Sequence, residues 1–283
     1  PLLSSIMISK KIAVANKESI ICGWHLIKKE LKKNRTDFIP IDSEHFSIWK
    51  LIENSKNDEL DTIYLTASGG PFLNKKLKKI KNIHPNHALK HPNWKMGKKI
   101  TIDSATMMNK VFEVIEAKKI FNLDIKKIKV LIHPSSYVHS VIKFKNGVIK
   151  LLAHDTNMMI PIGSAIFNNY EYNYKTKILD IDKINKIQFL KPKISQFPVL
   201  KFLNQINNND DIFEIILIAA NDELVNYYLE QKIKYSDIYT LLNKIIKKRE
   251  IMVKSINKKL NLREINEIVD IVKSKVRKLV YQL

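Results

Sequence analysis

The chain has little of the residue types that mark secreted, membrane and dinucleotide-binding proteins. Its single cysteine, Cys22, excludes an internal disulfide, which is typical of a reducing compartment, so we expect a cytoplasmic protein. The longest apolar run, 215–220, is far shorter than the roughly 20 residues that cross a bilayer, so no membrane partner is expected. The six glycines form no Gly-x-Gly-x-x-Gly pattern, so the signature of a dinucleotide-binding loop is missing.

Acidic residues are also scarce, with 28 against 49 basic ones, which gives a formal net charge of +21. Such an excess ordinarily indicates a nucleic-acid or anionic-membrane partner, because clustered cations release counterions on binding. Here the excess is nearly all lysine and is spread along the chain, with no aromatic-interleaved basic motif. We therefore expect no nucleic-acid partner.

The hydrophobic content of 45% is ample for globular cores, and local patterns predict an α/β protein. The first part has the rhythm helix, strand (11–15), helix (19–33) and strand (37–41), which is typical of the edge of a parallel sheet. Strand-like runs on both sides of Pro134 contain His133 and His139, whose spacing matches no familiar metal-ligand pattern, so both are expected to be structural. Beyond residue 196 the pattern becomes helical, and the expected helices of a small bundle are 197–205, 212–230, 236–248 and 262–281.

The segment 98–121 concentrates polar chemistry. Residues 98–102 are predicted to form a short strand, and Asp103 or Ser104 is suited to cap a following helix whose N-terminus favours a phosphate. Asn109 and Lys110 stand four and three residues before Glu113, so all three can project from neighbouring positions on one helical face. The alternative for this helix alone is a surface Lys–Glu pair.

A second acidic group, Asp42 and Glu44, directly follows the strand predicted at 37–41. On an extended backbone these two side chains point the same way, and the carboxyl ends of strands are where α/β sheets build their sites. Together with Glu113 they would form a three-carboxylate cage suited to Mg²⁺ or Mn²⁺ and not to zinc. Asp-x-Glu at a strand end is also typical of a plain turn before a capped helix.

Two further segments carry glycine and proline. Residues 68–71, Ser-Gly-Gly-Pro, predict a turn, either a plain tight turn or one that allows close approach of a phosphate. Residues 90–97 predict a mobile loop that carries His91, Trp94 and Met96. Outside any wider context, Trp94 could equally pack on the core and His91 could be a capping or surface residue.

Five of these segments occur in one order, and together they resemble the 1-deoxy-D-xylulose 5-phosphate reductoisomerase family. They are residues 15–19 (ANKES), 40–45 (PIDSEH), 68–72 (SGGPF), 91–97 (HPNWKMG) and 103–110 (DSATMMNK). Weaker similarity continues from residue 133 to residue 221.

The resemblance implies a metal- and NADPH-dependent oxidoreductase and isomerase of the non-mevalonate route to isoprene precursors. Such an enzyme converts 1-deoxy-D-xylulose 5-phosphate to 2-C-methyl-D-erythritol 4-phosphate, is usually a homodimer, and uses Mn²⁺ or Mg²⁺. By resemblance, the metal ligands are Asp42, Glu44 and Glu113, and the catalytic residues are these three with Lys17 and His91. The implied substrate-binding residues are Lys17, Ser43, Glu44, Ser68, His91, Trp94, Ser104, Asn109, Lys110 and Glu113. The positions that match NADPH contacts are Asn16, Glu18 and Gly97.

The implied fold is a partial Rossmann-like parallel sheet, an α+β catalytic domain and a C-terminal α-helical bundle. We expect a remnant of the N-terminal NADPH-binding domain (1–41), the catalytic domain that binds metal and substrate (42–175), a linker (176–195) and the helical domain (196–283). Most of the cofactor domain is thus expected to be missing from this chain. The alternative function is a truncated chain that binds metal and sugar phosphate without reducing anything. Val111 stands where the family usually has glycine, which bears on rate and substrate fit.

Overall fold

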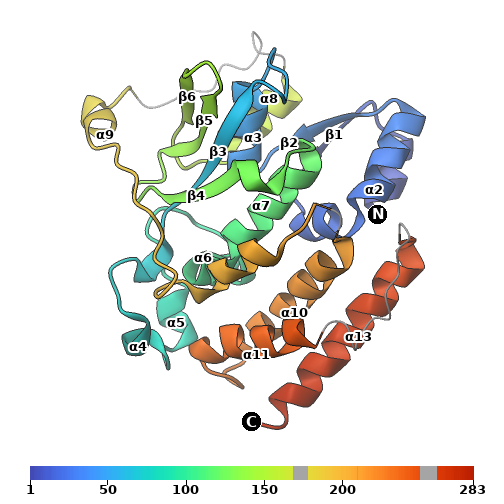
Figure 1. The fold of residues 1–283 in the computed structure, drawn as a ribbon, viewed down its shortest axis with the longest axis vertical. Coiled ribbons are helices and arrows are strands. Elements are labelled where there is room, and N and C mark those ends of the chain that lie inside the picture. The colour runs from blue at the N-terminus through green and yellow to red at the C-terminus, as the bar shows by residue number, and fades with distance from the viewer. Residues whose placement is uncertain (168–177, 209, 249–259) are drawn as a thin grey trace.

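The structure of the protein is a computed structural model that describes residues 1–167, 178–208, 210–248 and 260–283. These residues form two β-sheets and the helices that pack on them (Figure 1). The smaller sheet pairs β1 (Lys11–Val14) with β2 (Asp37–Pro40) in parallel, from Lys11 opposite Asp37 to Val14 opposite Pro40. α1 (Leu2–Met7) precedes it, and α2 (Lys17–Asn34) connects its strands. The predicted βα rhythm at the edge of a parallel sheet is confirmed.

The larger sheet has four strands in the order β4-β3-β5-β6. They are β3 (Leu60–Ala67), β4 (Ile128–Ile132), β5 (Val138–Phe144) and β6 (Ile149–Ala153). β3 runs parallel to β4 and antiparallel to β5, and β6 continues antiparallel to β5. The sheet is therefore mixed, and β4 and β5 are the runs predicted on either side of Pro134.

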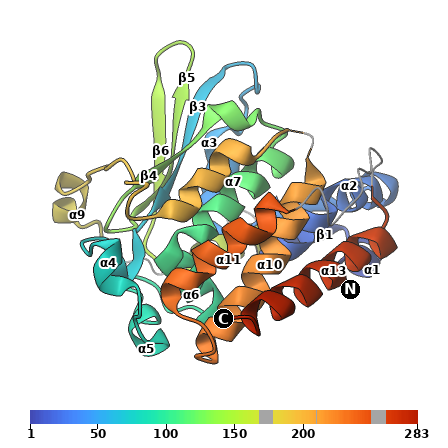
Figure 2. The same ribbon diagram turned by 60° about the horizontal axis from the view of Figure 1, so that its bottom comes forward.

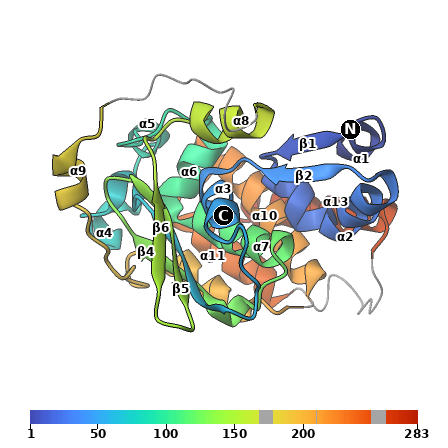
Figure 3. The same cartoon turned by 90° about the horizontal axis from the view of Figure 1, so that it is seen from above.

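Helices α3 (Ser43–Leu51) and α7 (Met108–Ile120) lie between the two sheets, as Figure 3 shows from above. Their apolar faces cover the larger sheet: Ile48 and Val114 pack in one buried cluster with Leu65 and Ile142. Contacts on both sides bury α7 nearly all round, and the buried residues include the charged side chains of Lys110, Glu113, Glu116 and Lys118. This position places the polar first turns of both helices next to each other.

The shorter elements connect these parts. They are η1 (Gly70–Phe72), α4 (Leu77–Ile80), α5 (Pro85–Ala88), η2 (Ile125–Lys127), α8 (Met159–Ile166) and α9 (Ile181–Asn185). Within the expected linker, 176–177 lie outside the described residues, and the rest contains α9 and a β-bridge from Leu190 to Ile132.

The expected strand at 98–102 is wrong, because these residues open helix α6 (Lys98–Thr106). Its buried side is tied to the C-terminal helices: Asn221 donates a hydrogen bond to Asp103 at 2.7 Å, and the Tyr235 hydroxyl donates one to the Ala105 carbonyl at 2.8 Å. Ile102 is fully buried in the same core. Tertiary burial therefore overrides the local strand preference of Ile-Thr-Ile.

Four segments after residue 196 complete the fold (Figure 2): the first packs on α7, the second packs on α6, and the last two pack on the second. They are η3 (Pro198–Gln205), α10 (Asp211–Leu229), α11 (Tyr235–Lys247) and α13 (Leu262–Val280). The three expected α-helices are confirmed, while 197–205 is a 3₁₀-helix. The buried cluster that includes these helices extends from Ile21 to Val280, so they share one core with α2, α6 and α7. In the described parts of the chain, no helix combines the length and the apolarity required to cross a membrane.

The turn predicted at 68–71 is confirmed, and it places the backbone of Gly70 close to the backbone of α6. Gly69 and Gly70 have φ of 82° and 63°, which favour glycine. A Cβ on Gly70 would lie 3.0 Å from the Ser104 carbonyl oxygen and 3.1 Å from the Ala105 Cα. Gly70 therefore lets the end of β3 approach α6 closely.

We expect Gly70→Ala to lower the free energy of unfolding by about 1–3 kcal/mol, because it adds a backbone clash to an unfavourable φ. Gly147→Ala is the matched control: its φ is 89°, but a Cβ there meets nothing within 4 Å. Urea unfolding should show the larger loss for Gly70→Ala. Equal losses of unfolding free energy in the two variants would mean that the close approach of Gly70 to α6 does not contribute to stability.

Candidate functional site

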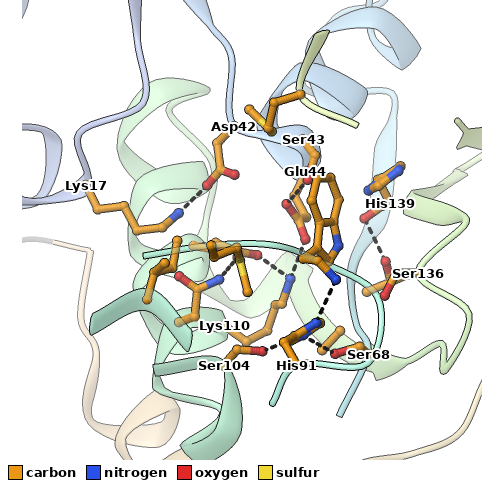
Figure 4. Close-up of a pocket in the computed structure, with 18 of the residues that line it drawn as sticks. Lys17, Asp42, Ser43, Glu44, Ser68, His91, Ser104, Lys110, Ser136 and His139 are labelled. Carbon is orange, nitrogen blue, oxygen red and sulfur yellow. Dashed lines mark hydrogen bonds and ion pairs between the residues drawn. The ribbon is translucent and has the colours of Figure 1, made fainter. Parts of the chain in front are cut away.

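A cavity of about 220 Å³ opens where the first turns of α2, α3 and α7 meet the carboxyl end of β3 (Figure 4). It brings together every residue that was predicted to bind metal or substrate. These are Lys17, Asp42, Ser43, Glu44, Ser68, His91, Trp94, Ser104, Asn109, Lys110 and Glu113. Their individual roles stay predictions, but their assembly in one place is a property of the fold.

The start of α3 shapes the acidic end of the cavity. Asp42 occupies the N-cap position with φ −61° and ψ 135°, yet its side chain caps no backbone N–H. Ser43 and Glu44 lie in the first helical turn, and the Ser43 hydroxyl donates to Glu44 Oε2 at 2.6 Å. The expected extended backbone through Asp42 and Glu44 is therefore wrong. Both interpretations of the Asp-x-Glu segment therefore apply: Asp42 and Glu44 lie in a turn that begins a helix, and the same turn presents both carboxylates to the cavity.

Three carboxylates converge from α3 and α7. One oxygen each of Asp42, Glu44 and Glu113 lies within 4.8 Å of the others. Burial and the negative charge of Glu44 raise the pKa of Glu113 well above its ordinary value. Burial also disfavours the charged form of Glu44, but Lys110, His139 and hydrogen bonds from Lys110 and Ser43 outweigh it and lower the pKa of Glu44. An all-oxygen set of three carboxylates, of which Glu113 is buried and Asp42 and Glu44 are partly buried, fits a hard divalent cation such as Mg²⁺ or Mn²⁺.

Two buried lysines neutralise part of this negative charge. Lys110 lies 2.7 Å from Glu44 Oε1 and forms an ion pair with Glu113 on its own helix. Lys17 forms an ion pair with Asp42 and lies 3.0 Å from Oε2 of Glu116. Burial acts to lower the pKa of both ammonium groups, but their carboxylate partners raise it overall.

Glu116 was missed by the sequence reasoning, although a signal was present. It stands three residues after Glu113, so the two carboxylates share one helical face, and a buried carboxylate requires a partner.

The opposite end of the cavity lies at the junction of α6 and α7. The predicted cap at Asp103 or Ser104 is wrong: both lie inside α6, and the helices break at Met107, whose φ is 69°. The Thr106 hydroxyl accepts from the Met108 N–H instead, at 3.3 Å. Ser104 thus comes from the last turn of α6, while Asn109 and Lys110 come from the first turn of α7.

His91 links the two serine hydroxyls of this end. Its Nε2 lies 3.1 Å from the Oγ atoms of both Ser68 and Ser104. Its Nδ1 accepts from the backbone N–H groups of Asn93, at 3.1 Å, and Trp94, at 3.0 Å. An Nδ1 that accepts two hydrogen bonds carries no proton, so Nε2 carries it and points at the serine oxygens. Burial lowers the pKa of His91 to about 4, so this tautomer is neutral at physiological pH.

The loop predicted at 90–97 is confirmed as a segment without helix or strand until α6 begins. Asn93 fastens it: its Nδ2 donates to the Pro134 carbonyl at 2.7 Å and to the Ser136 Oγ at 2.9 Å. Trp94 lies edge-on to the ring of His139, with 6.1 Å between ring centroids. The loop therefore forms one wall of the cavity.

Several lining residues were not anticipated. They are Ala15, Thr66, Ala67, Lys95, Ile100, Met107, Ser136, His139 and Met158. His139 had been expected to be structural; it stacks on His154, with ring centroids 3.8 Å apart, and also faces the cavity.

The three cofactor candidates do not line the cavity. The Asn16 side chain caps α2 by accepting from the Ser19 N–H at 2.9 Å. Glu18 is 2.9 Å from Lys99, and Gly97 is the N-cap of α6. All three lie at the border of the cavity, next in sequence to the lining residues Ala15, Lys17 and Met96.

Comparison with known proteins gives consistent matches. The family model for the 1-deoxy-D-xylulose 5-phosphate reductoisomerase C-terminal domain matches residues 38–121, and that for the DXP reductoisomerase C-terminal domain matches residues 154–278. The 1-deoxy-D-xylulose 5-phosphate reductoisomerase of Pelagibacter ubique (strain HTCC1062) is 54% identical over 276 residues, which cover 98% of this chain and 71% of that protein. The enzyme of the same name from Sulfurihydrogenibium sp. (strain YO3AOP1) is 42% identical over 85% of this chain and 63% of its own length.

Solved structures agree over nearly the whole chain. A crystal structure of DOX-P reductoisomerase in complex with NADPH, fosmidomycin and magnesium superimposes with a TM-score of 0.89 at 32% identity, covering 99% of this chain and 72% of the other. The Zymomonas mobilis enzyme in complex with NADPH gives a TM-score of 0.86 at 28% identity, covering 100% and 72%. The chain is thus shorter than its relatives, and spans less than two thirds of the Sulfurihydrogenibium protein.

We expect the imidazole of His91 to titrate near pH 4. Its folded pKa lies below the ordinary value of about 6.5, so its contribution to stability is present above that value and is lost as the pH falls through 4. Proton uptake at Nδ1 would break the bonds to Asn93 and Trp94. NMR of the histidine rings, assigned with His91→Asn, measures the midpoint. A midpoint near 6.5 would contradict the assigned tautomer and burial.

We expect Asn93→Ala to release the loop 90–97. Two hydrogen bonds worth about 0.5–1.5 kcal/mol each are lost, so backbone hydrogen exchange at Trp94 should become roughly 10-fold faster or more. Asn57→Ala is the control, because Asn57 also donates to a backbone carbonyl, that of Phe121, but far from the cavity. Unchanged exchange in Asn93→Ala would show that other contacts hold the loop.

Proposed function

Because this chain belongs to the 1-deoxy-D-xylulose 5-phosphate reductoisomerase family, we propose that it forms the metal- and substrate-binding part of such an enzyme. The reaction is the isomerisation of 1-deoxy-D-xylulose 5-phosphate, followed by reduction with NADPH to 2-C-methyl-D-erythritol 4-phosphate. One observation carries the proposal: an acidic end and a hydroxyl-rich end face each other across a single small cavity. A sugar phosphate has the same two-ended chemistry.

The phosphate of the substrate would lie at the end formed by Ser68, Ser104, His91, Asn109 and Lys110. There the His91 Nε2–H and both serine hydroxyls can donate hydrogen bonds, and the Lys110 ammonium supplies the charge. His91 also accepts the N–H groups of Asn93 and Trp94, so one imidazole connects phosphate recognition to the loop. Binding of the phosphate would thereby stabilise the loop 90–97 in the position described above.

The sugar end of the substrate would lie at Asp42, Glu44 and Glu113. A divalent ion bound by these carboxylates would polarise the carbonyl and hydroxyl oxygens of the sugar. Lys17 is placed to steady negative charge on those oxygens, with Ser43 beside it. Trp94 and the rest of the loop 90–97 would exclude water from the reacting atoms.

NADPH would approach along the border formed by Asn16, Glu18 and Gly97. Related structures were determined with NADPH and with magnesium, which supports both groups as cofactors here. Oxygen ligands of this kind serve Mg²⁺ and Mn²⁺ alike.

A second candidate function is binding of metal and sugar phosphate without reduction by the chain on its own. It is favoured by the placement of the cofactor candidates outside the cavity and by the 71% of the Pelagibacter protein that the chain covers. NADPH oxidation by the purified 283 residues would exclude this second function.

Four further expectations remain proposals: a homodimer, a cytoplasmic location, the division at residues 41, 175 and 195, and an effect of Val111 on rate. Val111 is fully buried in the core and does not line the cavity, so any effect on substrate would pass through helix α7. Val111→Gly with unchanged kinetics would remove that concern.

We expect calorimetry to show that the chain binds one Mn²⁺, more tightly in the presence of 1-deoxy-D-xylulose 5-phosphate. Asp42→Asn/Glu113→Gln should weaken binding by more than about 100-fold, since outer-shell changes alone cost 10–100-fold. Asp58→Asn/Glu59→Gln, which alters two exposed acidic residues, is the control for net charge. Equal affinity in the two double variants would refute a metal site at the acidic end.

A further inference from the structure

We propose that Glu116 is a positioning residue that holds the Lys17 ammonium when a divalent cation takes Asp42 from it. The inference rests on the proposed function, because it presumes that Asp42 is a metal ligand. It assigns to a fourth carboxylate a role distinct from that of the three in the cage.

Among the described residues, the Glu116 carboxylate has Lys17 as its hydrogen-bond and ion-pair partner. Its side chain is 1% exposed and accepts from Lys17 Nζ through Oε2 at 3.0 Å. Its other oxygen, Oε1, has no hydrogen-bond partner within the described part of the chain. Lys17, 6% exposed, is equally enclosed. Neither group can turn to bulk water, so each depends on the other.

Two cations compete for the Asp42 carboxylate: the Lys17 ammonium and the proposed divalent metal ion. Its carboxylate forms the second ion pair of Lys17 and also belongs to the group of oxygens that could hold a metal. When a divalent ion coordinates Asp42, the attraction between Asp42 and Lys17 is weakened. A buried ammonium left without an anion would be strongly destabilised. Glu116 removes this conflict, because it keeps Lys17 paired with a carboxylate that does not belong to the cage.

The charges of the cluster agree with this division. The ammonium groups of Lys17 and Lys110 face the carboxylates of Asp42, Glu44, Glu113 and Glu116. Burial raises the pKa of Glu113 and Glu116, but a carboxylate that coordinates a metal is deprotonated and Glu116 faces the Lys17 ammonium. With all six groups ionised, two negative charges are left over, which one divalent cation neutralises. Without Glu116 only one would remain, and binding of the same ion would leave a buried positive charge.

A competing explanation is a second metal site. One atom each of Asp42, His45 and Glu116 also lies within 4.8 Å of the others. However, Lys17 Nζ bonds to two of these three residues, Asp42 and Glu116. The cation of this group is therefore the lysine itself.

The experiment measures Mn²⁺ affinity and stoichiometry by calorimetry on the full 283-residue chain, with urea unfolding of each variant in the absence of metal. The variants are Glu116→Gln, Lys17→Met, their combination, and Glu214→Gln. The last is the matched control, because Glu214 is also a fully buried glutamate paired with lysines, Lys118 and Lys119, but does not touch the cage.

We expect one Mn²⁺ in the wild type and an affinity 10–100-fold weaker in Glu116→Gln, where Lys17 has only Asp42 as an anion. Adding Lys17→Met to Glu116→Gln should restore the affinity to within about 3-fold, because the competitor for Asp42 and its positive charge are both gone. Glu214→Gln should lower stability and leave Mn²⁺ affinity unchanged. A merely structural role of Glu116 would not produce the rescue by Lys17→Met.

Three outcomes would overturn the inference: equal affinity in Glu116→Gln and wild type, no rescue in the double variant, or two Mn²⁺ ions per wild-type chain. Failure of the wild type to bind any Mn²⁺ would instead refute the proposed function. If Glu116→Gln does not fold, Glu116→Asp replaces it, because this variant keeps the negative charge but places it one methylene farther from the Lys17 ammonium. Its Mn²⁺ affinity should then be lower than that of the wild type, and wild-type affinity in that variant would also overturn the inference.

Discussion

The pairing of two buried lysines with four carboxylates is the interaction on which the rest of the site depends. Lys17 comes from α2, Asp42 and Glu44 from the start of α3, and Lys110, Glu113 and Glu116 from α7. None of these charges is stable alone in a buried place, so the three helix starts must converge for any of them to be compensated. The same convergence leaves an excess of negative charge, which is the property that attracts a divalent cation.

Much of the fold could be predicted from local patterns. The parallel pair β1–β2 follows from two short apolar strands around an amphipathic helix, and α10, α11 and α13 follow from helical periodicity. The metal cage was indicated by acidic residues after a strand and on a helix face, whereas the substrate residues were implied by the resemblance of five ordered segments to one family. Their meeting in one cavity agrees with that interpretation.

What escaped prediction depends on tertiary contacts. The residue types at 98–102 favour a strand, but Ile102 and Asp103 are buried against α10, and this burial favours a helix. The tautomer of His91 depends on two N–H groups of its own loop, and the role of Asn93 on a carbonyl 41 residues away. In the sequence, Glu116 is only one of several charged residues of the helix 108–120. In each case the conformation or role of the residue depends on a contact in the folded structure, and the local sequence around the residue does not reveal that contact.

The most direct test of a two-ended cavity is a crystal structure of this chain with Mn²⁺ and 1-deoxy-D-xylulose 5-phosphate, with the metal located by its anomalous signal. The account predicts one Mn²⁺ among Asp42, Glu44 and Glu113, and a phosphate that accepts from His91 Nε2 between Ser68 and Ser104. A phosphate at the carboxylate end, or Mn²⁺ bound elsewhere with the three carboxylates still paired to Lys17 and Lys110, would contradict it.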